Sequence, residues 1–356
     1  MYSDDDVNSA VAAGIFNNET ARAFREHVAQ RQHSAHADEE QFRLVTGFND
    51  IFVVIACCLL LVSANYIAAQ FAAGLGPFVV AILAWGLSEF FIRKRRMALP
   101  AIVLMFCFVL GAARATFDWL PMLGLPNDLD LLGAGALHHM ALYVALNVAI
   151  TCLVTAFCAW LHWRRFAVPI TIAAITASLV ALVLSLILGF FPKAHALWLL
   201  LLLLSGLGVF AFALYWDSTD PLRETRRADV AFWLHLLAAP LMVHPVFALL
   251  GTFDGMSEQS QPFIIIAVYL FIGFVSLAID RRALMVSALG YVIYALSNLL
   301  SNQGGISTGF ATTALLIGAG LLLLSAFWAP CRHMALLMFP RAWCDKLPPL
   351  RSKHID

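Results

Sequence analysis

Apolar residues form long runs from Phe48 onward, and polar residues collect in the short turns between them. Each run is close to the roughly 20 residues that a helix needs to cross a lipid bilayer. The ten runs are 50–71, 74–92, 98–116, 137–161, 167–190, 196–216, 229–251, 263–280, 283–301 and 307–329. This pattern predicts an all-α, polytopic bundle of about ten transmembrane helices within residues 48–330.

Residues 1–47 carry a different, mostly polar pattern. A few apolar positions at helical spacing predict a first short helix that Gly14 ends, and a second helix that begins near Asn17 or Asn18. We therefore expect an N-terminal helical hairpin and a linker before the first span. Because the chain lacks a basic start followed by a short apolar core, we expect no cleaved signal peptide.

Residues 331–356 mix aromatic and aliphatic side chains with arginines and lysines. Such a mixture is typical of a segment that lies along the lipid headgroups, with its basic groups near the phosphates. We predict an interfacial C-terminal segment here. The lipid bilayer is thus an expected partner, and both the N-terminal hairpin and this segment offer a place where another protein can dock.

The composition agrees with a membrane-embedded chain, since 62% of the residues are hydrophobic, 12% are charged and the mean hydropathy is +0.83. These values exclude a water-soluble globular protein. The formal net charge is zero, and acidic residues outnumber basic ones in the N-terminal hairpin. Because nucleic-acid binding needs a basic surface, no nucleic-acid partner is expected.

Basic residues are distributed unequally between the turns. If the N-terminus is cytoplasmic, all of the 22 lysines and arginines except Arg114 and Lys193 fall in cytoplasmic segments. This is the distribution that the positive-inside rule describes. We therefore predict a multi-pass protein of a bacterial inner membrane, with both termini in the cytoplasm.

Three predicted cytoplasmic turns resemble one another, since each joins two spans through an arginine pair. Their sequences are FIRKRRMALP (91–100), WLHWRRFAVP (161–170) and AIDRRALMV (278–286). Duplication of a helical hairpin would produce this repeat, and so would independent selection for positive turns. Both explanations stay open.

The segment 217–245 differs most from a plain lipid-soluble helix. A basic loop leads into the seventh span, which carries Asp229 at its start, His235 and His244 inside it and Pro240 near its middle. Pro240 lacks a backbone N–H group and is expected to bend the helix. Ionisable groups at membrane depth are costly, so Asp229, His235 and His244, on a helix that Pro240 bends, are candidate residues of a solute or ion pathway together with Pro240.

Structural roles also explain the same side chains. Asp229 can cap the helix by accepting hydrogen bonds from free backbone N–H groups. A neutral histidine can form a hydrogen bond with a neighbouring helix instead of relaying protons or holding a ligand. Asp50 stands before the first span as Asp229 stands before the seventh, and it joins the candidate pathway residues.

Other polar residues within the spans have simpler explanations. Glu89 lies four residues before Arg93, a spacing that predicts an ion pair within one helix. Asn147 and Asn298 are expected to form hydrogen bonds with neighbouring helices.

The sequence shows no motif for a known kind of catalysis. A phosphate-binding glycine loop, a zinc-binding HExxH and a nucleophile elbow are all missing. His138, His139 and Met140 are only a weak candidate for a soft metal ion. The seven cysteines lack metal-ligand spacing and are expected to form no disulfides. We therefore predict no catalytic residue, no metal site and no cofactor, and an enzyme is disfavoured.

A distinctive combination of features links distant parts of the chain. It consists of the short acidic hairpin, the sequence GFNDIF at the start of the first span, about ten helices and RRADVAFWLHLLAAPLMVHP in the middle. In this layout the chain resembles bacterial inner-membrane proteins that are grouped as families of unknown function. The resemblance covers most of the chain. It implies a helical inner-membrane protein, and it implies no substrate and no catalytic residue.

These observations favour a permease-like protein for a small solute or ion. A non-transporting membrane scaffold or assembly component is the first alternative, and an intramembrane enzyme that acts on a lipid-linked substrate is the second. The scaffold would use residues 1–47 and the C-terminal segment. The enzyme would need a cluster of polar groups that the sequence does not reveal.

Overall fold

The structure is a computed structural model of the whole chain. It describes residues 7, 10–17, 19–24, 48–123, 136–221, 223, 225–249 and 261–282, and single residues and short stretches between 285 and 338. The chain forms two compact units, Met1–Thr46 and Gly47–Asp356. In these described parts every regular element is a helix, which confirms the predicted all-α class.

In the first unit, Gly14 adopts a left-handed conformation with φ of 72° after a short helical stretch. The Asn17 side-chain oxygen then accepts a hydrogen bond from the Thr20 amide at 2.6 Å, which caps the next helical stretch at 19–24. Gly14 and Asn17 therefore hold the positions that the sequence predicted for the end of one helix and the start of the next.

The second unit begins with three helices that pack on one another. They are α3 (Phe48–Ala69), α4 (Leu75–Ser88) and α5 (Ala98–Trp119). Helix α4 continues as a π-helical turn, η1 (Glu89–Lys94), and α5 ends in a 3-10 turn, η2 (Leu120–Leu123). Buried side chains such as Leu61, Ala84 and Leu104 fill the space between the three helices.

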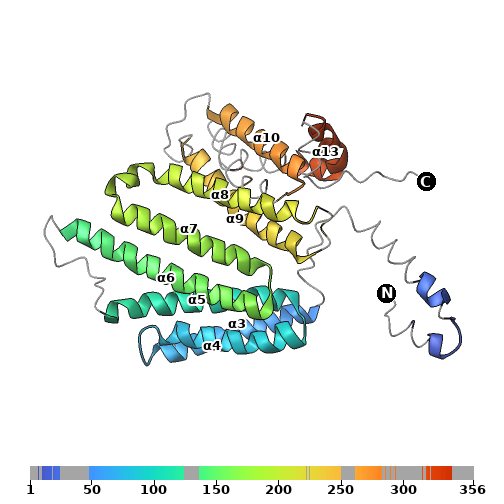
Figure 1. Ribbon diagram of the computed structural model, residues 1–356, viewed down its shortest axis with the longest axis horizontal. Coiled ribbons are helices and arrows are strands. Elements are labelled where there is room, and N and C mark those ends of the chain that lie inside the picture. The colour runs from blue at the N-terminus through green and yellow to red at the C-terminus, as the bar shows by residue number, and fades with distance from the viewer. Residues whose placement is uncertain are drawn as a thin grey trace. The chain divides into compact units, whose positions relative to one another are not determined.

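Four further helices continue the bundle. They are α6 (Ala136–Phe166), α7 (Ile170–Phe190), α8 (Trp198–Ser218) and α9 (Arg226–Leu249), with a 3-10 turn, η4 (Pro192–Leu197), before α8. Figure 1 shows the helices from α3 to α9 side by side, with each hairpin packed on the next. Helices α8 and α9 form a close pair whose core includes Val209, Val230 and Leu234.

Helix α10 (Gln261–Ile279) packs against the α8–α9 pair. Its residue Ile279 shares a small core with Ala239 of α9 and Phe210 of α8. Helix α13 (Trp328–Leu336) contacts α10, and the two lie together in Figure 1. The helical segment Gly318–Ala326 meets α13 at an angle of 75°.

Seven helices among the described residues are long and apolar enough to cross a membrane, or eight if the bent pair Gly318–Ala326 and Trp328–Leu336 is one span. These helices make the chain an integral membrane protein. They cover the first seven predicted spans, and α10 covers the predicted eighth. The structure describes only part of the predicted spans 283–301 and 307–329, and only part of the predicted interfacial segment 331–356. The total of about ten spans therefore stays a prediction.

One end of the bundle holds the arginine-rich turns, and we call it the arginine-bearing end. It comprises the turns at 93–97, 164–169, 219–225 and 280–282. Each turn contains one non-glycine residue with a positive φ, a conformation that L-residues rarely adopt. These residues are Arg96 (53°), Ala167 (51°), Arg223 (57°) and Asp280 (62°), and the described part of the chain has no others.

The positive-φ residue occupies a different place in each of the three similar turns. Arg96 is the second residue of its arginine pair, Ala167 follows its pair, and Asp280 precedes its pair. The turns therefore do not match residue by residue in their backbone conformation. This difference favours independent selection of positive turns over duplication of one hairpin.

Gly206 brings α8 and α9 into direct contact at mid-helix. A Cβ atom on Gly206 would lie 2.7 Å from the Met242 side chain and 2.8 Å from the Leu241 carbonyl carbon. Close to this contact, Pro240 is exposed on the surface of the second unit. Helix α9 continues through both Pro240 and Pro245, so neither proline ends it.

Candidate functional site

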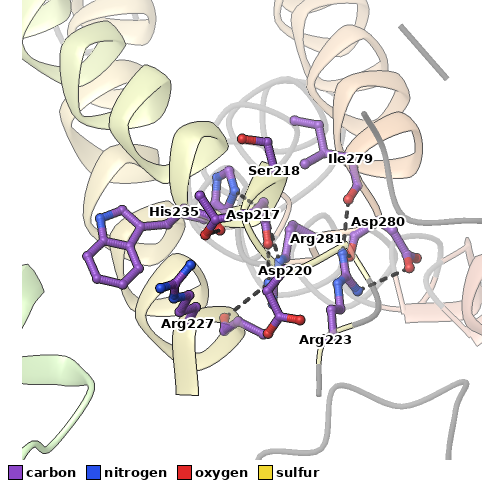
Figure 2. A network of polar contacts seen from close by, with 12 residues as sticks. Asp217, Ser218, Asp220, Arg223, Arg227, His235, Ile279, Asp280 and Arg281 are labelled. Atoms are coloured by element: carbon purple, nitrogen blue, oxygen red, sulfur yellow. Dashed lines mark hydrogen bonds and ion pairs between the residues drawn. The ribbon is translucent and has the colours of Figure 1, made fainter. Parts of the chain in front are cut away.

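Three buried ionisable side chains meet at the arginine-bearing end of α8, α9 and α10 (Figure 2). Arg281, which follows α10, donates two hydrogen bonds to the Asp217 carboxylate of α8, from Nη2 to Oδ1 at 2.5 Å and from Nε to Oδ2 at 3.3 Å. The Nε2 atom of His235 in α9 lies 2.8 Å from Asp217 Oδ2. We call Asp217, His235 and Arg281 the buried triad, because their exposed fractions are only 6%, 0% and 3%.

The charge of Asp217 determines the hydrogen-bonding role of His235. A carboxylate paired with a guanidinium is ionised and only accepts hydrogen bonds, so His235 Nε2 carries a hydrogen and donates it. His235 Nδ1 is buried and has no hydrogen-bond partner among the residues that the structure describes. The ring also packs edge-on against Phe210 of α8, with 5.4 Å between the ring centroids. The imidazole is thus fixed in orientation while one nitrogen remains able to accept a proton.

Arg281 is held by α9 and α10 as well as by α8. Its Nη2 donates a hydrogen bond to the Ala228 carbonyl of α9 at 3.1 Å. Its amide donates to the Ser276 carbonyl of α10 at 3.0 Å, and the Ser276 hydroxyl donates to the Arg281 carbonyl. A single guanidinium therefore joins the ends of three helices.

The turn between α8 and α9 is closed by Asp220 and Thr225. The buried Asp220 carboxylate accepts hydrogen bonds from the Thr225 amide at 2.9 Å and from its hydroxyl at 2.6 Å. The Thr225 oxygen in turn accepts a hydrogen bond from the Arg227 amide at 3.2 Å, which caps α9. The expectation that Asp229 caps this helix is therefore wrong. Helix α9 begins at Arg226, and Asp229 lies within its first turn.

Asp280 forms a second polar cluster next to the buried triad (Figure 2). Arg223 Nη1 donates a hydrogen bond to Asp280 Oδ2 at 3.1 Å, and Arg223 Nη2 donates to the Asp280 carbonyl at 3.1 Å. From α13, Trp328 donates its indole N–H to Asp280 Oδ1 at 2.7 Å, and Arg332 lies 3.7 Å from Oδ2. Asp280 therefore connects the α8–α9 turn to α13, directly beside Arg281 in the sequence.

Of the predicted pathway residues, only His235 belongs to the buried triad. Asp229 is half-buried in the first turn of α9 and interacts electrostatically with Arg281. His244 is half-buried further along α9, where its ring centroid lies 6.1 Å from that of Trp198 at the start of α8. Asp229 therefore lies near the triad, whereas His244 belongs to the other end of the helix.

The predicted pathway residues are spread over the bundle. Asp229 and His244 are 15 positions apart, which corresponds to about 22 Å along a helix. Pro240 is exposed between them. Asp50 is buried in the first turn of α3, whose main neighbours are α4 and α5 rather than α9. In the structure, the predicted pathway residues therefore do not form one site.

The sequence interpretation missed the other two members of the buried triad. Asp217 directly follows the predicted sixth span and therefore resembled a loop residue, while Arg281 resembled one of many basic turn residues. The available signal was a carboxylate at the end of an apolar run and the sequence Asp-Arg-Arg at 280–282. Neither signal reveals that residues 64 positions apart are paired.

Glu89 forms a separate polar contact at the arginine-bearing end. The predicted pair with Arg93 is confirmed, with Arg93 Nη1 3.1 Å from Glu89 Oε2. Glu89 also accepts two hydrogen bonds from Arg165 of α6, from Nε at 2.6 Å and from Nη2 at 3.1 Å. This second contact, between residues 76 positions apart, was not predicted. It fixes the α4–α5 turn beside the α6–α7 turn.

His162 of α6 is a further buried histidine, with an exposed fraction of 0%. Its ring centroid lies 5.6 Å from that of Phe108, 6.1 Å from that of Trp85 and 4.7 Å from that of Phe166. His162 Nδ1 is 3.5 Å from the Thr171 hydroxyl. The aromatic neighbours show that this histidine is part of the core between α4, α5, α6 and α7.

Among the described residues, no group of three His, Cys, Asp or Glu side chains could hold a metal ion. The side chains of His138, His139 and Met140, and all of Asn298, lie outside the described residues. The cysteines that the structure describes are free thiols.

Comparisons of the chain with protein-family models, with curated proteins and with solved structures found no match. The site is therefore interpreted from its geometry. The buried triad combines a fixed anion, a fixed cation and a histidine whose second nitrogen can accept a proton. Such an arrangement can change the strength of a contact between helices when one proton binds.

Proposed function

We propose that the protein is a permease-like integral membrane protein for a small solute or ion, and that the buried triad holds the arginine-bearing end of α8, α9 and α10 closed in one conformation. The observation that carries this proposal is an ionised group shared by three helices with almost no exposure to solvent. Buried ion pairs contribute little net stability. Ionisable groups inside membrane bundles more often serve transport or proton transfer.

His235 gives the buried triad a way to respond to protons. In its neutral form the charges of Asp217 and Arg281 balance. A proton on His235 Nδ1 adds a second positive charge close to Arg281 and Arg223, with Asp217 as the carboxylate in contact with the ring. Repulsion between these cations in a site of low polarity then weakens the contact between the α8–α9 pair and α10.

The proposal places the arginine-bearing end in the cytoplasm of a bacterial inner membrane. The distribution of lysines and arginines between the turns supports this orientation. Asp229, which interacts electrostatically with Arg281, then lies at the cytoplasmic end of the pathway. His244 and the exposed Pro240 lie further along α9, so they belong to the outer half of the same helix.

A membrane scaffold is the second candidate function, and the Asp280 cluster favours it. Asp280 and its contacts with Arg223, Trp328 and Arg332 attach α13 to the α8–α9 turn. A rigid attachment of this kind would present the C-terminal segment to a protein partner. The scaffold needs no change of conformation at the buried triad.

Electrical measurements on proteoliposomes distinguish the two functions. Wild-type protein in proteoliposomes is adsorbed on a solid-supported membrane and challenged with pools of amino acids, sugars, organic anions and monovalent cations at about pH 5 and about pH 8. The permease proposal expects a solute-dependent current from at least one pool, larger at one pH than at the other. The His235→Gln variant, which can still donate a hydrogen bond to Asp217 but cannot take up a proton, is expected to lose the difference between the two pH values.

The control variant is Asp118→Asn, which removes a carboxylate paired with the exposed Arg114, outside the arginine-bearing end. It is expected to keep the current. Folded wild-type protein that gives neither a current nor uptake of labelled solute with any pool would overturn the permease proposal and favour the scaffold. A His235→Gln current with the pH dependence of the wild type would show that the buried triad takes no part in proton-dependent transport.

A further inference from the structure

The Glu89–Arg165 contact brings together two basic turns that are far apart in the sequence. The first turn carries Arg93, Lys94, Arg95 and Arg96, and the second carries Arg164 and Arg165. We call these six residues the basic cluster. Glu89 accepts hydrogen bonds from Arg93 and Arg165 and is the carboxylate that joins the two turns.

The basic cluster differs from the other half of the arginine-bearing end in its charge balance. At α8, α9 and α10, Arg281 is paired with Asp217, and both Arg223 and Arg332 lie against Asp280. In the basic cluster, Glu89 accepts hydrogen bonds from Arg93 and Arg165, and the turns 93–97 and 164–169 themselves contain no acidic residue. The positive-inside rule explains basic residues in every turn. It does not explain why the turns 219–225 and 280–282 contain acidic residues, with Asp280 paired to Arg223, whereas the turns 93–97 and 164–169 contain none.

Aromatic rings hold several of these cations at the membrane surface. The charged groups of Lys94 and Arg95 lie 5.9 Å and 5.7 Å from the centre of the Phe90 ring, and the Arg164 guanidinium lies 5.2 Å from the centre of the Trp160 ring. A guanidinium stacked on a ring keeps its N–H groups available at its edge. Arg95 and Arg164 can therefore donate hydrogen bonds to an anion while their positions are fixed.

An exposed apolar strip runs from the basic cluster along α6. Phe157, Trp160, Leu161 and Arg164 are spaced so that they lie on one face of the helix. Phe157 is 56% exposed, Trp160 42% and Leu161 38%, and the rings of Phe157 and Trp160 stack with 5.8 Å between their centroids. The strip thus ends at the Arg164 guanidinium. A lipid-binding surface has this arrangement, because the acyl chain contacts apolar side chains and the headgroup contacts a cation.

We propose that the basic cluster and this strip form a binding site for an anionic phospholipid that carries two phosphates, of the diphosphatidylglycerol type. The N–H groups of Arg95 and Arg164, from the two joined turns, contact the phosphates. The acyl chains lie along Phe157, Trp160 and Leu161. Two phosphates match two turns, and the excess positive charge of the cluster matches a doubly charged headgroup.

The test measures thermal unfolding of the full chain in neutral detergent, with increasing amounts of diphosphatidylglycerol, of phosphatidylcholine or of inorganic phosphate alone. The double variant Arg95→Gln and Arg164→Gln removes two cations that do not bond to Glu89, so the contact between the turns remains. The matched control is Arg226→Gln with Arg227→Gln, which removes two exposed cations at the start of α9. Native mass spectrometry counts the retained lipids.

We expect diphosphatidylglycerol to raise the unfolding temperature of the wild type, and phosphatidylcholine and phosphate to leave it unchanged. Loss of two surface cations should weaken the apparent affinity of the Arg95 and Arg164 double variant about thirtyfold. The control variant should retain most of the effect and its bound lipid. Equal losses in both double variants would overturn the proposal, because they would indicate a general attraction to negative surfaces. Stabilisation by phosphate alone would overturn it in favour of a site for a free anion.

Discussion

The guanidinium of Arg281 donates two hydrogen bonds to the carboxylate of Asp217, although 64 positions separate the two residues in the sequence. Nearly all of both side chains is removed from solvent. This pair joins the end of α8 to Arg281 in the turn after α10. Because both side chains are buried, removing either one is expected to destabilise the fold strongly.

The Asp217→Asn variant is expected to be strongly destabilised. It keeps the shape of the side chain and leaves the Arg281 charge buried without its counter-ion, a change that costs about 3–5 kcal/mol in comparable buried pairs. Thermal unfolding in detergent measures the loss. Replacing both partners, as in Asp217→Leu with Arg281→Met, should destabilise less than the sum of the two single changes. If the double variant loses as much stability as the two single variants together, the two side chains stabilise the fold through separate contacts.

Replacing His235 separates hydrogen bonding from proton binding. Glutamine at this position can still donate an N–H group to Asp217 but cannot take up a proton. We expect His235→Gln to fold, and His235→Ala to lose stability because Asp217 loses a donor. Acidification should lower the unfolding temperature of the wild type more than that of His235→Gln, since only the wild type gains a positive charge beside Arg281. Parallel pH profiles would contradict a role for this histidine in proton binding.

Gly206 and Gly208 provide a matched pair of substitutions in α8. Alanine at Gly206 would place a methyl group 2.7 Å from Met242 and 2.8 Å from the Leu241 backbone, so α8 and α9 must move apart. Overpacking of this kind costs about 1–3 kcal/mol. Alanine at Gly208 meets no atom within 4 Å and should stabilise the helix by about 0.5–1 kcal/mol. Unfolding temperatures of the two variants should therefore move in opposite directions.

Ala167 is held in a left-handed conformation, with φ of 51°, between α6 and α7. Glycine adopts this conformation without the Cβ clash, so Ala167→Gly is expected to gain up to about 1 kcal/mol of stability. The control is Ala174→Gly within α7, which should lose about 1 kcal/mol because glycine is a poor helix former. Denaturant titration of both variants checks the contrast. Destabilisation of Ala167→Gly would show that the backbone strain is small.

The position of the helices could be predicted from the sequence because lipid imposes a strict requirement on length and polarity. Predicted spans such as 98–116 and 167–190 lie within three residues of α5 and α7 at each end. The neighbours of each helix could not be predicted. A run such as the one in α8 is apolar on every side, so its pattern does not show which face meets α9 and which meets lipid.

The candidate site was predicted only in part, for a related reason. His235 could be recognised as a candidate residue from the sequence alone, because a histidine is rare within an apolar run. Asp217 and Arg281 lie at the ends of helices, where charged residues are common and usually hydrated. Only the packing of α8 against α9 and α10 shows that these two are buried, and this packing depends on contacts such as that of Gly206 with Leu241.

The distance between Asp217 and Arg281 in the sequence also orders the events of biosynthesis. Helix α8 enters the membrane before the ribosome has made the arginine that neutralises its carboxylate, 64 residues later. Until α10 follows, Asp217 has to stay in contact with water, because an uncompensated charge is excluded from the apolar interior. This end of the bundle therefore closes late. A chain whose synthesis stops before Arg281 therefore keeps this end of the bundle open and hydrated around Asp217. In this respect it differs from the full-length protein.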